Sequence, residues 1–250
     1  SSVCKDDQLS LLYTHYDRVV IGGCKPITRK LNLSVPEEFK AEFFLERREM
    51  GIINVGGSAI IKADGVEYSL GRLDCLYLGR GVKKITFSSQ DKKNPAILYF
   101  LSTLAHSTHP SRLMKNKNAT PLKLGKSATA NERIVYKYIH NEGIESCQLV
   151  MGITLLKKGS VWNSVPPHTH TRRMEAYFYF DLDESQRVFH FMGQTQETRH
   201  LVVANHEAVI SPPWSMHFGV GTASYGFIWG MAGENKEFTD MDPVPITTLK

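Results

Sequence analysis

The chain has 250 residues, of which 42% are apolar and 22% charged, and 30 basic against 25 acidic side chains give a net charge of +5. This composition excludes disordered and collagen-like chains, and it supplies enough apolar material for one large domain or two small ones. The positive charge is modest and mostly scattered, so it suits an anionic small molecule as well as it suits nucleic acid.

No apolar run approaches the roughly 20 residues that cross a bilayer, and the polar start SSVCKDDQLS does not resemble a secretory signal. Four cysteines stand far apart without a C-x-x-C pair, which argues against a cysteine zinc site and a disulfide framework. We therefore predict a cytoplasmic protein with reduced thiols and no membrane or nucleic-acid partner.

Short strands are predicted through most of the first half. Residues 36–39 can form one helical turn, with Pro36 at its first position. Residues 56–89 then contain β-rich runs separated by glycine-containing turns, and Asp64-Gly65 between two such runs is a strong hairpin signal. A spacing of roughly ten residues per strand predicts a sandwich or barrel.

Residues 107–133 are less hydrophobic and collect Lys, Asn, Pro and Ser. We predict an interdomain linker here, with its basic residues in a solvated loop. The β pattern then resumes in residues 146–156, 175–182, 187–193, 199–211 and 225–233. The predicted fold is all-β with few short helices, in two barrel-like domains at residues 1–115 and 116–250.

The sequence HTHTRRMEAYFYF contains two histidines separated by one residue, followed by a glutamate in an aromatic run. Side chains alternate between the faces of a strand, so His168 and His170 should point the same way. Glu175 has the opposite parity. A turn or bulge between Thr171 and Met174 would return its carboxylate to the same interior.

A fourth group is expected from a later strand, where SPPWSMHFG places His217 four residues after Pro213. Three imidazoles and one carboxylate form a site for a divalent transition metal, with one or two positions open for water or substrate. The predicted ligands are His168, His170, Glu175 and His217. Ordinary polar roles are expected for His106, His109, His190, His200 and His206.

These motifs resemble the two metal motifs of the cupin superfamily, small β-barrels that hold one metal through three histidines and one glutamate. Longer segments resemble the family of 5-keto-4-deoxyuronate isomerases, which are bicupin enzymes. They are PITRKLNL, FLERREMGIINVGG and DCLYLGRG upstream, and FHFMGQTQETRH, SPPWSMHFGVG and FIWGMAGEN downstream. The resemblance runs from about Tyr13 to Leu249. Members usually begin before the residue numbered 1 here, so this sequence is expected to lack their N-terminal segment.

The resemblance implies a bicupin that isomerises an aldose to a ketose in pectin breakdown, converting 5-dehydro-4-deoxy-D-glucuronate to 3-deoxy-D-glycero-2,5-hexodiulosonate. It also implies a zinc-binding homo-oligomer, a hexamer, in the bacterial cytoplasm. The family's ligand positions fall on His168, His170, Glu175 and His217. The first half has neither metal motif, so residues 1–115 are expected to form a barrel without its own metal.

Moving a carbonyl by one carbon requires removal of a proton and stabilisation of the enediolate, and a metal can serve the second need as a Lewis acid. Arg173 and Tyr177 share the parity of Glu175, so they are candidates for the cavity wall. A planar guanidinium can bind both oxygens of a substrate carboxylate. Arg172 should face outward, unless a local bulge exchanges the two arginines.

Glu197 is a candidate base, and Arg199 a candidate second contact to the anion. A solvated strand face explains both residues equally well.

Two rival functions use the same barrel. A metal dioxygenase shares the three-histidine, one-glutamate set but would need Fe(II) and oxygen, whereas a non-catalytic cupin would bind uronates without turnover. The donor set also accommodates Mn, Fe, Co or Ni, so zinc is expected from the resemblance and not from the ligands. An anaerobic turnover assay separates the three functions.

Overall fold

The structure is a computed structural model that describes residues 2–250. It confirms the predicted all-β class, with two cupin-like halves built from antiparallel sheets. The helical segments within these residues are short 3-10 turns: η1 (Tyr16–Arg18), η2 (Glu37–Phe39), η3 (Asn116–Asn118), η4 (Ser127–Thr129) and η5 (Ile246–Thr248). No helix in this part of the chain has the length and hydrophobicity to span a bilayer.

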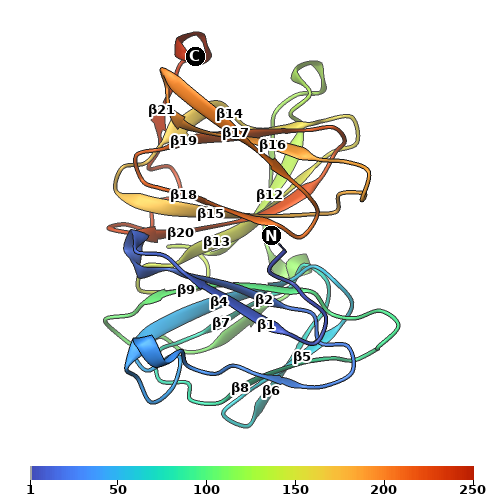
Figure 1. Cartoon of the computed structure of the whole chain (residues 1–250), viewed down its shortest axis with the longest axis vertical. Coiled ribbons are helices and arrows are strands. Elements are labelled where there is room, and N and C mark those ends of the chain that lie inside the picture. The colour runs from blue at the N-terminus through green and yellow to red at the C-terminus, as the bar shows by residue number, and fades with distance from the viewer. Residues whose placement is uncertain (1) are drawn as a thin grey trace. The chain divides into compact units, whose positions relative to one another are not determined.

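The chain divides into two compact units. The N-terminal unit comprises Val3–Ala119 and Tyr138–Val150, and the C-terminal unit is made chiefly of Thr120–Lys137 and Met151–Lys250. In each unit two sheets face each other (Figure 1). The division into domains at residues 1–115 and 116–250 stays a prediction.

The N-terminal unit has a six-stranded and a four-stranded sheet. The six-stranded sheet has the order β1 (Leu9–Tyr13), β2 (Val20–Cys24), β9 (Leu98–Leu104), β4 (Arg48–Asn54), β7 (Cys75–Leu78), β10 (Arg112–Met114). The four-stranded sheet has the order β3 (Leu31–Asn32), β8 (Ile85–Ser89), β5 (Ala59–Ala63), β6 (Val66–Leu70).

The two sheets of the N-terminal unit enclose an apolar core. Met50 and Ile52 enter it from β4, and Ile61 and Phe87 enter it from the smaller sheet. The predicted hairpin is confirmed, because Asp64 and Gly65 join β5 to β6 with positive φ angles of 46° and 90°. A two-residue turn with both φ angles positive matches the twist of the strands that it joins.

The C-terminal unit has a six-stranded and a five-stranded sheet. The first has the order β11 (Pro121–Leu124), β12 (Arg133–Ile139), β13 (Val150–Leu156), β20 (Gly226–Gly233), β15 (Arg173–Phe180), β18 (Ala208–Ser211). The second has the order β17 (Glu197–Val203), β16 (Val188–Gln194), β19 (Met216–Gly221), β14 (Trp162–Thr169), β21 (Asp242–Pro243).

The segment predicted to be a linker, residues 107–133, is more ordered than a linker. Within it, β10 pairs with β7 of the N-terminal unit, and β11 pairs with β12 of the C-terminal unit. The polar composition therefore marks short edge strands as well as loops, because an edge strand leaves one side open to solvent.

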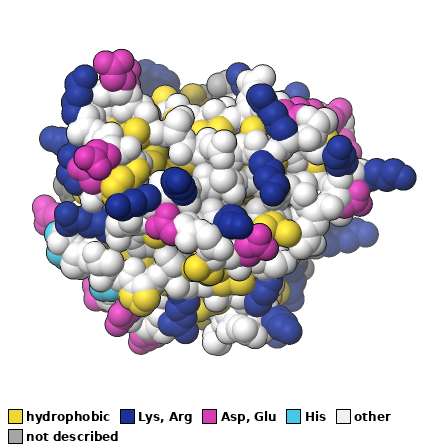
Figure 2. Space-filling model, turned by 90° about the horizontal axis from the view of Figure 1, so that it is seen from below, with side chains coloured by type: hydrophobic (Ala, Val, Ile, Leu, Met, Phe, Trp, Pro, Cys, Tyr) yellow, Lys and Arg dark blue, Asp and Glu magenta, His cyan; other side chains and the backbone are white. Residues whose placement is uncertain are grey.

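The distribution of charged side chains and the state of the cysteines agree with the sequence-based expectations. On the face shown in Figure 2, Lys and Arg side chains are dispersed among Asp and Glu and do not gather into one patch. The four cysteines, all within the described residues, form no disulfide, and Cys4, Cys24 and Cys75 are buried.

A buried carboxylate fastens a distant segment to the N-terminal unit. Glu49 on β4 is fully buried, and its Oε1 accepts the backbone N–H groups of Gln148 at 2.8 Å and Leu149 at 2.9 Å. Its Oε2 accepts the N–H of Cys147 and the hydroxyl of Tyr77, both at 2.7 Å. Each carboxylate oxygen therefore receives two donors.

Glu49→Gln should destabilise the protein, because either orientation of the amide turns its NH2 group toward at least one backbone N–H group, which can only donate. We expect a loss of about 3 kcal/mol, the scale for breaking buried hydrogen bonds to a charged group. The measurement is the midpoint of urea unfolding. Glu67→Gln, at an exposed residue that pairs with Lys62 at 3.6 Å, is the matched control and should unfold like the wild type. Equal midpoints for all three proteins would contradict this role of Glu49.

Candidate metal centre

Three strands and a turn bring the four predicted ligands together in the C-terminal unit. His168 near the end of β14 lies directly opposite His217 on the neighbouring strand β19. His170 follows β14, and Glu175 lies on β15. One ligand atom from each residue can be chosen so that all four lie within 4.8 Å of one another.

The parity difference between the histidines and the glutamate is resolved by a turn at the predicted place. The chain turns at Thr171 and Arg172, where the N–H of Arg173 bonds to the carbonyl of His170 at 3.1 Å. Glu175 then faces the cavity together with Arg173.

Backbone carbonyls fix the tautomers of two imidazoles. Nδ1 of His170 lies 2.9 Å from the carbonyl oxygen of Arg173, and Nδ1 of His217 lies 3.2 Å from that of Ser215 and 2.9 Å from the hydroxyl oxygen of Ser211. A carbonyl oxygen only accepts, so both Nδ1 atoms must carry the proton. Each ring therefore turns its Nε2 toward Glu175, and the neutral form of the ring offers there a lone pair that a metal can take.

The positions of His170, His217 and Glu175 favour a cation between them. Nε2 of His170 and Nε2 of His217 each lie 2.9 Å from the same oxygen, Oε2 of Glu175. A proton between His170 and Glu175 satisfies that pair, but Nε2 of His217 then still has no hydrogen-bond partner in the described chain. A divalent metal satisfies both nitrogens at once. Donation from the other ring nitrogen to a carbonyl is what metal-ligating histidines usually show.

The protonation states also suit a metal. Burial, reinforced by the nearby His217, lowers the pKa of His168 to about 3, so this imidazole is neutral at pH 7. Burial alone would raise the pKa of Glu175, but the imidazoles of His217 and His170 outweigh burial and hold that pKa well below its usual range. A neutral imidazole and an ionised carboxylate are the forms that bind metal ions.

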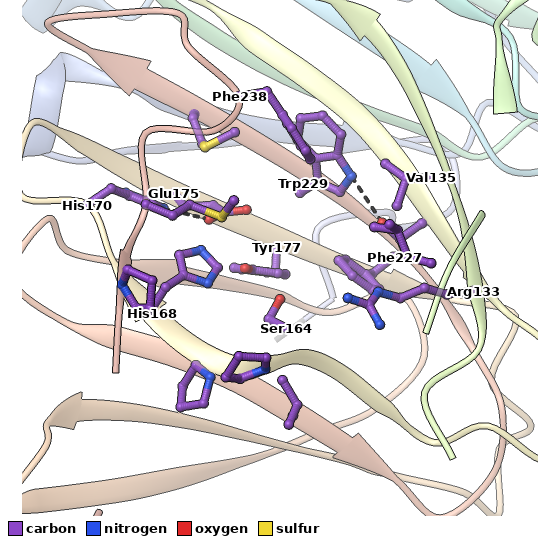
Figure 3. Close-up of a pocket in the computed structure, with 18 of the residues that line it drawn as sticks. Arg133, Val135, Ser164, His168, His170, Glu175, Tyr177, Phe227, Trp229 and Phe238 are labelled. Carbon is purple, nitrogen blue, oxygen red and sulfur yellow. Dashed lines mark hydrogen bonds and ion pairs between the residues drawn. The ribbon is translucent and has the colours of Figure 1, made fainter. Parts of the chain in front are cut away.

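A cavity of about 280 Å³ opens beside this cluster. In Figure 3 the side chains of His168, His170 and Glu175 lie at one end of the cavity, Arg133 lies at the other, and Tyr177 lies between them. The walls are largely apolar, with Val135, Val165, Phe227, Trp229, Met231 and Phe238. Such a cavity keeps water away and leaves few polar groups to orient a ligand.

Arg173 and Tyr177 both line the cavity, as predicted from parity. Arg173 is fully buried, and its Nη2 donates to the carbonyl of Asp240 at 3.0 Å. The hydroxyl of Tyr177 interacts with Ser164 and Glu175, and burial holds the pKa of Tyr177 well above its usual range, so the phenol stays protonated.

Arg172 points elsewhere. Its Nε donates to the carboxylate of Asp240 at 2.8 Å, and its Nη2 donates to Asp242 at 2.9 Å.

The structure does not bring Glu197 to the cavity. Glu197 begins the edge strand β17, its side chain is 71% exposed, and it pairs with Arg199 at 2.7 Å. Neither residue lines the cavity. The solvated strand face, which the sequence left open as an alternative, describes both residues, and nothing in this placement supports Glu197 as a base.

Two side chains near the cavity or the cluster, the half-buried Arg133 and the buried His190, were not predicted as part of the site. Arg133 reaches the cavity from β12, and its Nη1 donates to the carbonyl of Asn131 at 2.9 Å. His190, predicted to have an ordinary polar role, is fully buried, and its Nδ1 lies 2.7 Å from the hydroxyl of Tyr179. Its Nε2 has no partner within residues 2–250. Neither residue belongs to a spacing motif that would have marked it.

The sequence matches the KduI/IolB family over residues 4–244. The chain belongs to this family. A relative from Halalkalibacterium halodurans, named 4-deoxy-L-threo-5-hexosulose-uronate ketol-isomerase, is 53% identical over 97% of this chain and 88% of its own length. A protein of the same name from Shouchella clausii is 52% identical over 100% of this chain and 90% of its own length.

Solved structures with low sequence identity have a similar fold. An IolB-like protein from Salmonella typhimurium has a TM-score of 0.67 at 15% identity, and the match covers 88% of this chain and 85% of that one. The oxalate decarboxylase of Lactobacillus farciminis, solved as a formate complex, has a TM-score of 0.63 at 9% identity, with 95% and 83% covered.

His170→Ala should lower the metal content of the purified protein, because it removes a nitrogen donor that faces Glu175. Inductively coupled plasma mass spectrometry measures the metal, and far-ultraviolet circular dichroism checks that the β-sheet persists. His106→Ala, at an exposed histidine outside the cluster, is the matched control and should keep the wild-type metal content. Full metal retention in His170→Ala would remove His170 from the ligand set.

Proposed function

We propose that this chain is a metal-dependent ketol-isomerase that converts 5-dehydro-4-deoxy-D-glucuronate to 3-deoxy-D-glycero-2,5-hexodiulosonate in pectin breakdown. Relatives that carry the ketol-isomerase name are about half identical over nearly the whole chain, which supports the reaction. The observation that carries the proposal is the cavity itself, with three imidazoles and a carboxylate at one end and a guanidinium at the other.

The two ends of the cavity match the two ends of a sugar acid. The cluster of His168, His170, Glu175 and His217 would hold the metal, and a guanidinium would bind the substrate carboxylate. The volume of about 280 Å³ lies at the lower limit of the roughly 300–1,000 Å³ of small-molecule sites, so a six-carbon acid suits it better than an oligosaccharide.

Arg133 is the better placed of two arginines for the carboxylate. In the described structure its Nε and Nη2 have no protein partner, and burial lowers the pKa of Arg133, so a substrate anion would compensate a partly desolvated charge. Nη2 of Arg173 is instead held by the carbonyl of Asp240, and Arg173 lies close enough to Glu175 to interact with it, so only its Nε is left without a partner in the described chain. We assign anchoring to Arg133 and keep Arg173 as the second candidate, which also steadies the charge of Glu175.

The metal, when bound, would act as a Lewis acid that polarises the substrate carbonyl. Tyr177 stays protonated, so it can donate a hydrogen bond to an oxygen that gains negative charge as the substrate passes through an enediolate. The side chain of Ser164 forms a hydrogen bond with the Tyr177 hydroxyl and helps to orient it. Apolar walls exclude water, which would otherwise weaken both interactions.

Three further properties belong to this proposal. Zinc is the proposed metal, as the resemblance to the isomerase family implies, and a set of three imidazoles and one carboxylate is compatible with it. A homohexamer in the cytoplasm is the proposed assembly and location. Exposed apolar side chains in the C-terminal unit, at Leu201, Val202 and Trp214, support association, and four free cysteines suit a reducing compartment.

The purified protein should convert 5-dehydro-4-deoxy-D-glucuronate without oxygen. Proton NMR of the reaction in deuterium oxide measures product and label together, and proton transfer through an enediolate should place solvent deuterium on the former aldehyde carbon. A hydride shift would leave that carbon without solvent deuterium. Dependence on oxygen would favour a dioxygenase, and binding without turnover would favour a non-catalytic uronate-binding cupin.

Arg133→Lys should lower kcat/KM by about tenfold or more, because lysine keeps the charge but loses the fork that binds two oxygens. The metal content should not change, since Arg133 lies at the far end of the cavity from the cluster. Arg199→Lys, on the solvated face of β17, is the control and should leave kcat/KM unchanged. A loss in Arg173→Lys with none in Arg133→Lys would transfer the anchoring role to Arg173.

A further inference from the structure

The N-terminal unit contains a cavity of its own. Its volume is about 710 Å³, well within the range of small-molecule sites, roughly 300–1,000 Å³. Its lining comes from strands β1, β2, β4 and β9 and from the turns η1 and η2. This unit has neither metal motif, so the cavity needs an explanation that does not involve the candidate metal centre.

The lining of this cavity is cationic. It contains three arginines, Arg18, Arg47 and Arg48, and one carboxylate, that of Glu38; Arg47 is already paired with Glu46 at 3.0 Å, which leaves Arg18 and Arg48. The side chain of Arg18 is exposed and has no hydrogen bond or ion pair to any residue that the structure describes. An excess of positive charge in a concave site attracts anions.

Arg48 shows that the site is built and not a random gathering of surface charge. Its side chain is buried, and its Nε and Nη2 donate to the hydroxyl and carbonyl oxygens of Ser102 at 3.1 and 2.9 Å. Nη2 also donates to the carbonyl of Arg18. All these partners are neutral, and burial lowers the pKa of Arg48 to about 10.

The remaining nitrogen of Arg48 is free for a ligand. Nη1 forms no hydrogen bond within residues 2–250. It is not fully enclosed by protein, so a ligand can approach it. Arg48 lines the cavity, so a ligand there can reach this nitrogen. A buried guanidinium without a carboxylate is costly, and an anion in the cavity would offset that cost.

One wall of the cavity is aromatic. The ring of Phe39 lies 5.4 Å from Cζ of Arg48 and 5.6 Å from the ring of Tyr13, and Phe44 packs behind it at 5.9 Å. A ligand must therefore combine an anionic group with a face that tolerates aromatic carbon. Inorganic phosphate, which is hydrated on every side, meets only the first requirement.

We propose that this cavity binds a small organic carboxylate, with its anionic group on Arg48 and Arg18 and its carbon skeleton against Phe39 and Tyr13. The planar fork of a guanidinium matches the two oxygens of a carboxylate. The site is separate from the proposed isomerase site, because the residues that line the two cavities belong to different units.

Benzoate is a suitable probe, because it carries one carboxylate on an aromatic ring, and isothermal titration calorimetry on the full chain measures its binding. Arg18→Gln should weaken benzoate binding about tenfold, the scale of one charge-assisted hydrogen bond, while isomerase activity stays at the wild-type level. Lys92→Gln removes a positive charge from an exposed position of the same unit outside the cavity, so it is the matched control. Its benzoate affinity should equal that of the wild type.

A second variant and a second anion complete the test. Arg48→Lys keeps the charge but loses the fork, so it should also weaken benzoate binding, with circular dichroism as the check on folding. Wild-type affinity in Arg18→Gln would overturn the proposal. Tighter binding of inorganic phosphate than of benzoate would overturn the carboxylate class. Failure of Arg18→Gln to weaken binding, together with a change in its sedimentation coefficient, would show that the cavity is a contact between subunits.

Discussion

The C-terminal unit depends on one negative charge that is enclosed by the protein. Glu175 is buried, and the imidazoles of His170 and His217 converge on a single one of its oxygens. A buried carboxylate without a counter-charge is strongly unfavourable, so the surrounding strands must deliver a cation or the means to hold one. β14, β15 and β19 have to keep their register for this, because a slip of one residue would turn every side chain to the opposite face.

The two halves use the same architecture for different purposes. The N-terminal unit fills the space between its sheets with aliphatic and phenylalanine side chains, among them Ile52, Ile61 and Phe87. In the C-terminal unit, tyrosine and histidine rings such as Tyr177, Tyr179 and His190 occupy the equivalent space. Polar rings inside a barrel need fixed partners, and a network of fixed partners can hold reacting groups in place.

Strand periodicity is sufficient to predict that His168 and His170 share a face and that a turn must precede Glu175, because these relations are local. Parity also places Arg173 and Tyr177 correctly on the cavity wall. The sequence left two alternatives for Glu197, a base or a residue on a solvated face, because a strand pattern does not show whether another sheet covers that face. Arg133 could not be predicted, since β12 reaches the cavity only because its neighbour β13 lies beside the distant strand β20 in the sheet.

The four hydrogen-bond donors to Glu49 also determine when the N-terminal unit can complete its folding during translation. Three of them are backbone N–H groups at residues 147–149, on a segment that follows β11 and β12 of the other unit in the chain. A nascent chain that ends near residue 119 already contains all ten strands of the N-terminal unit, β1 to β10, but would bury Glu49 with only Tyr77 as its donor. The N-terminal half therefore cannot finish folding on the ribosome before the C-terminal half has begun to emerge.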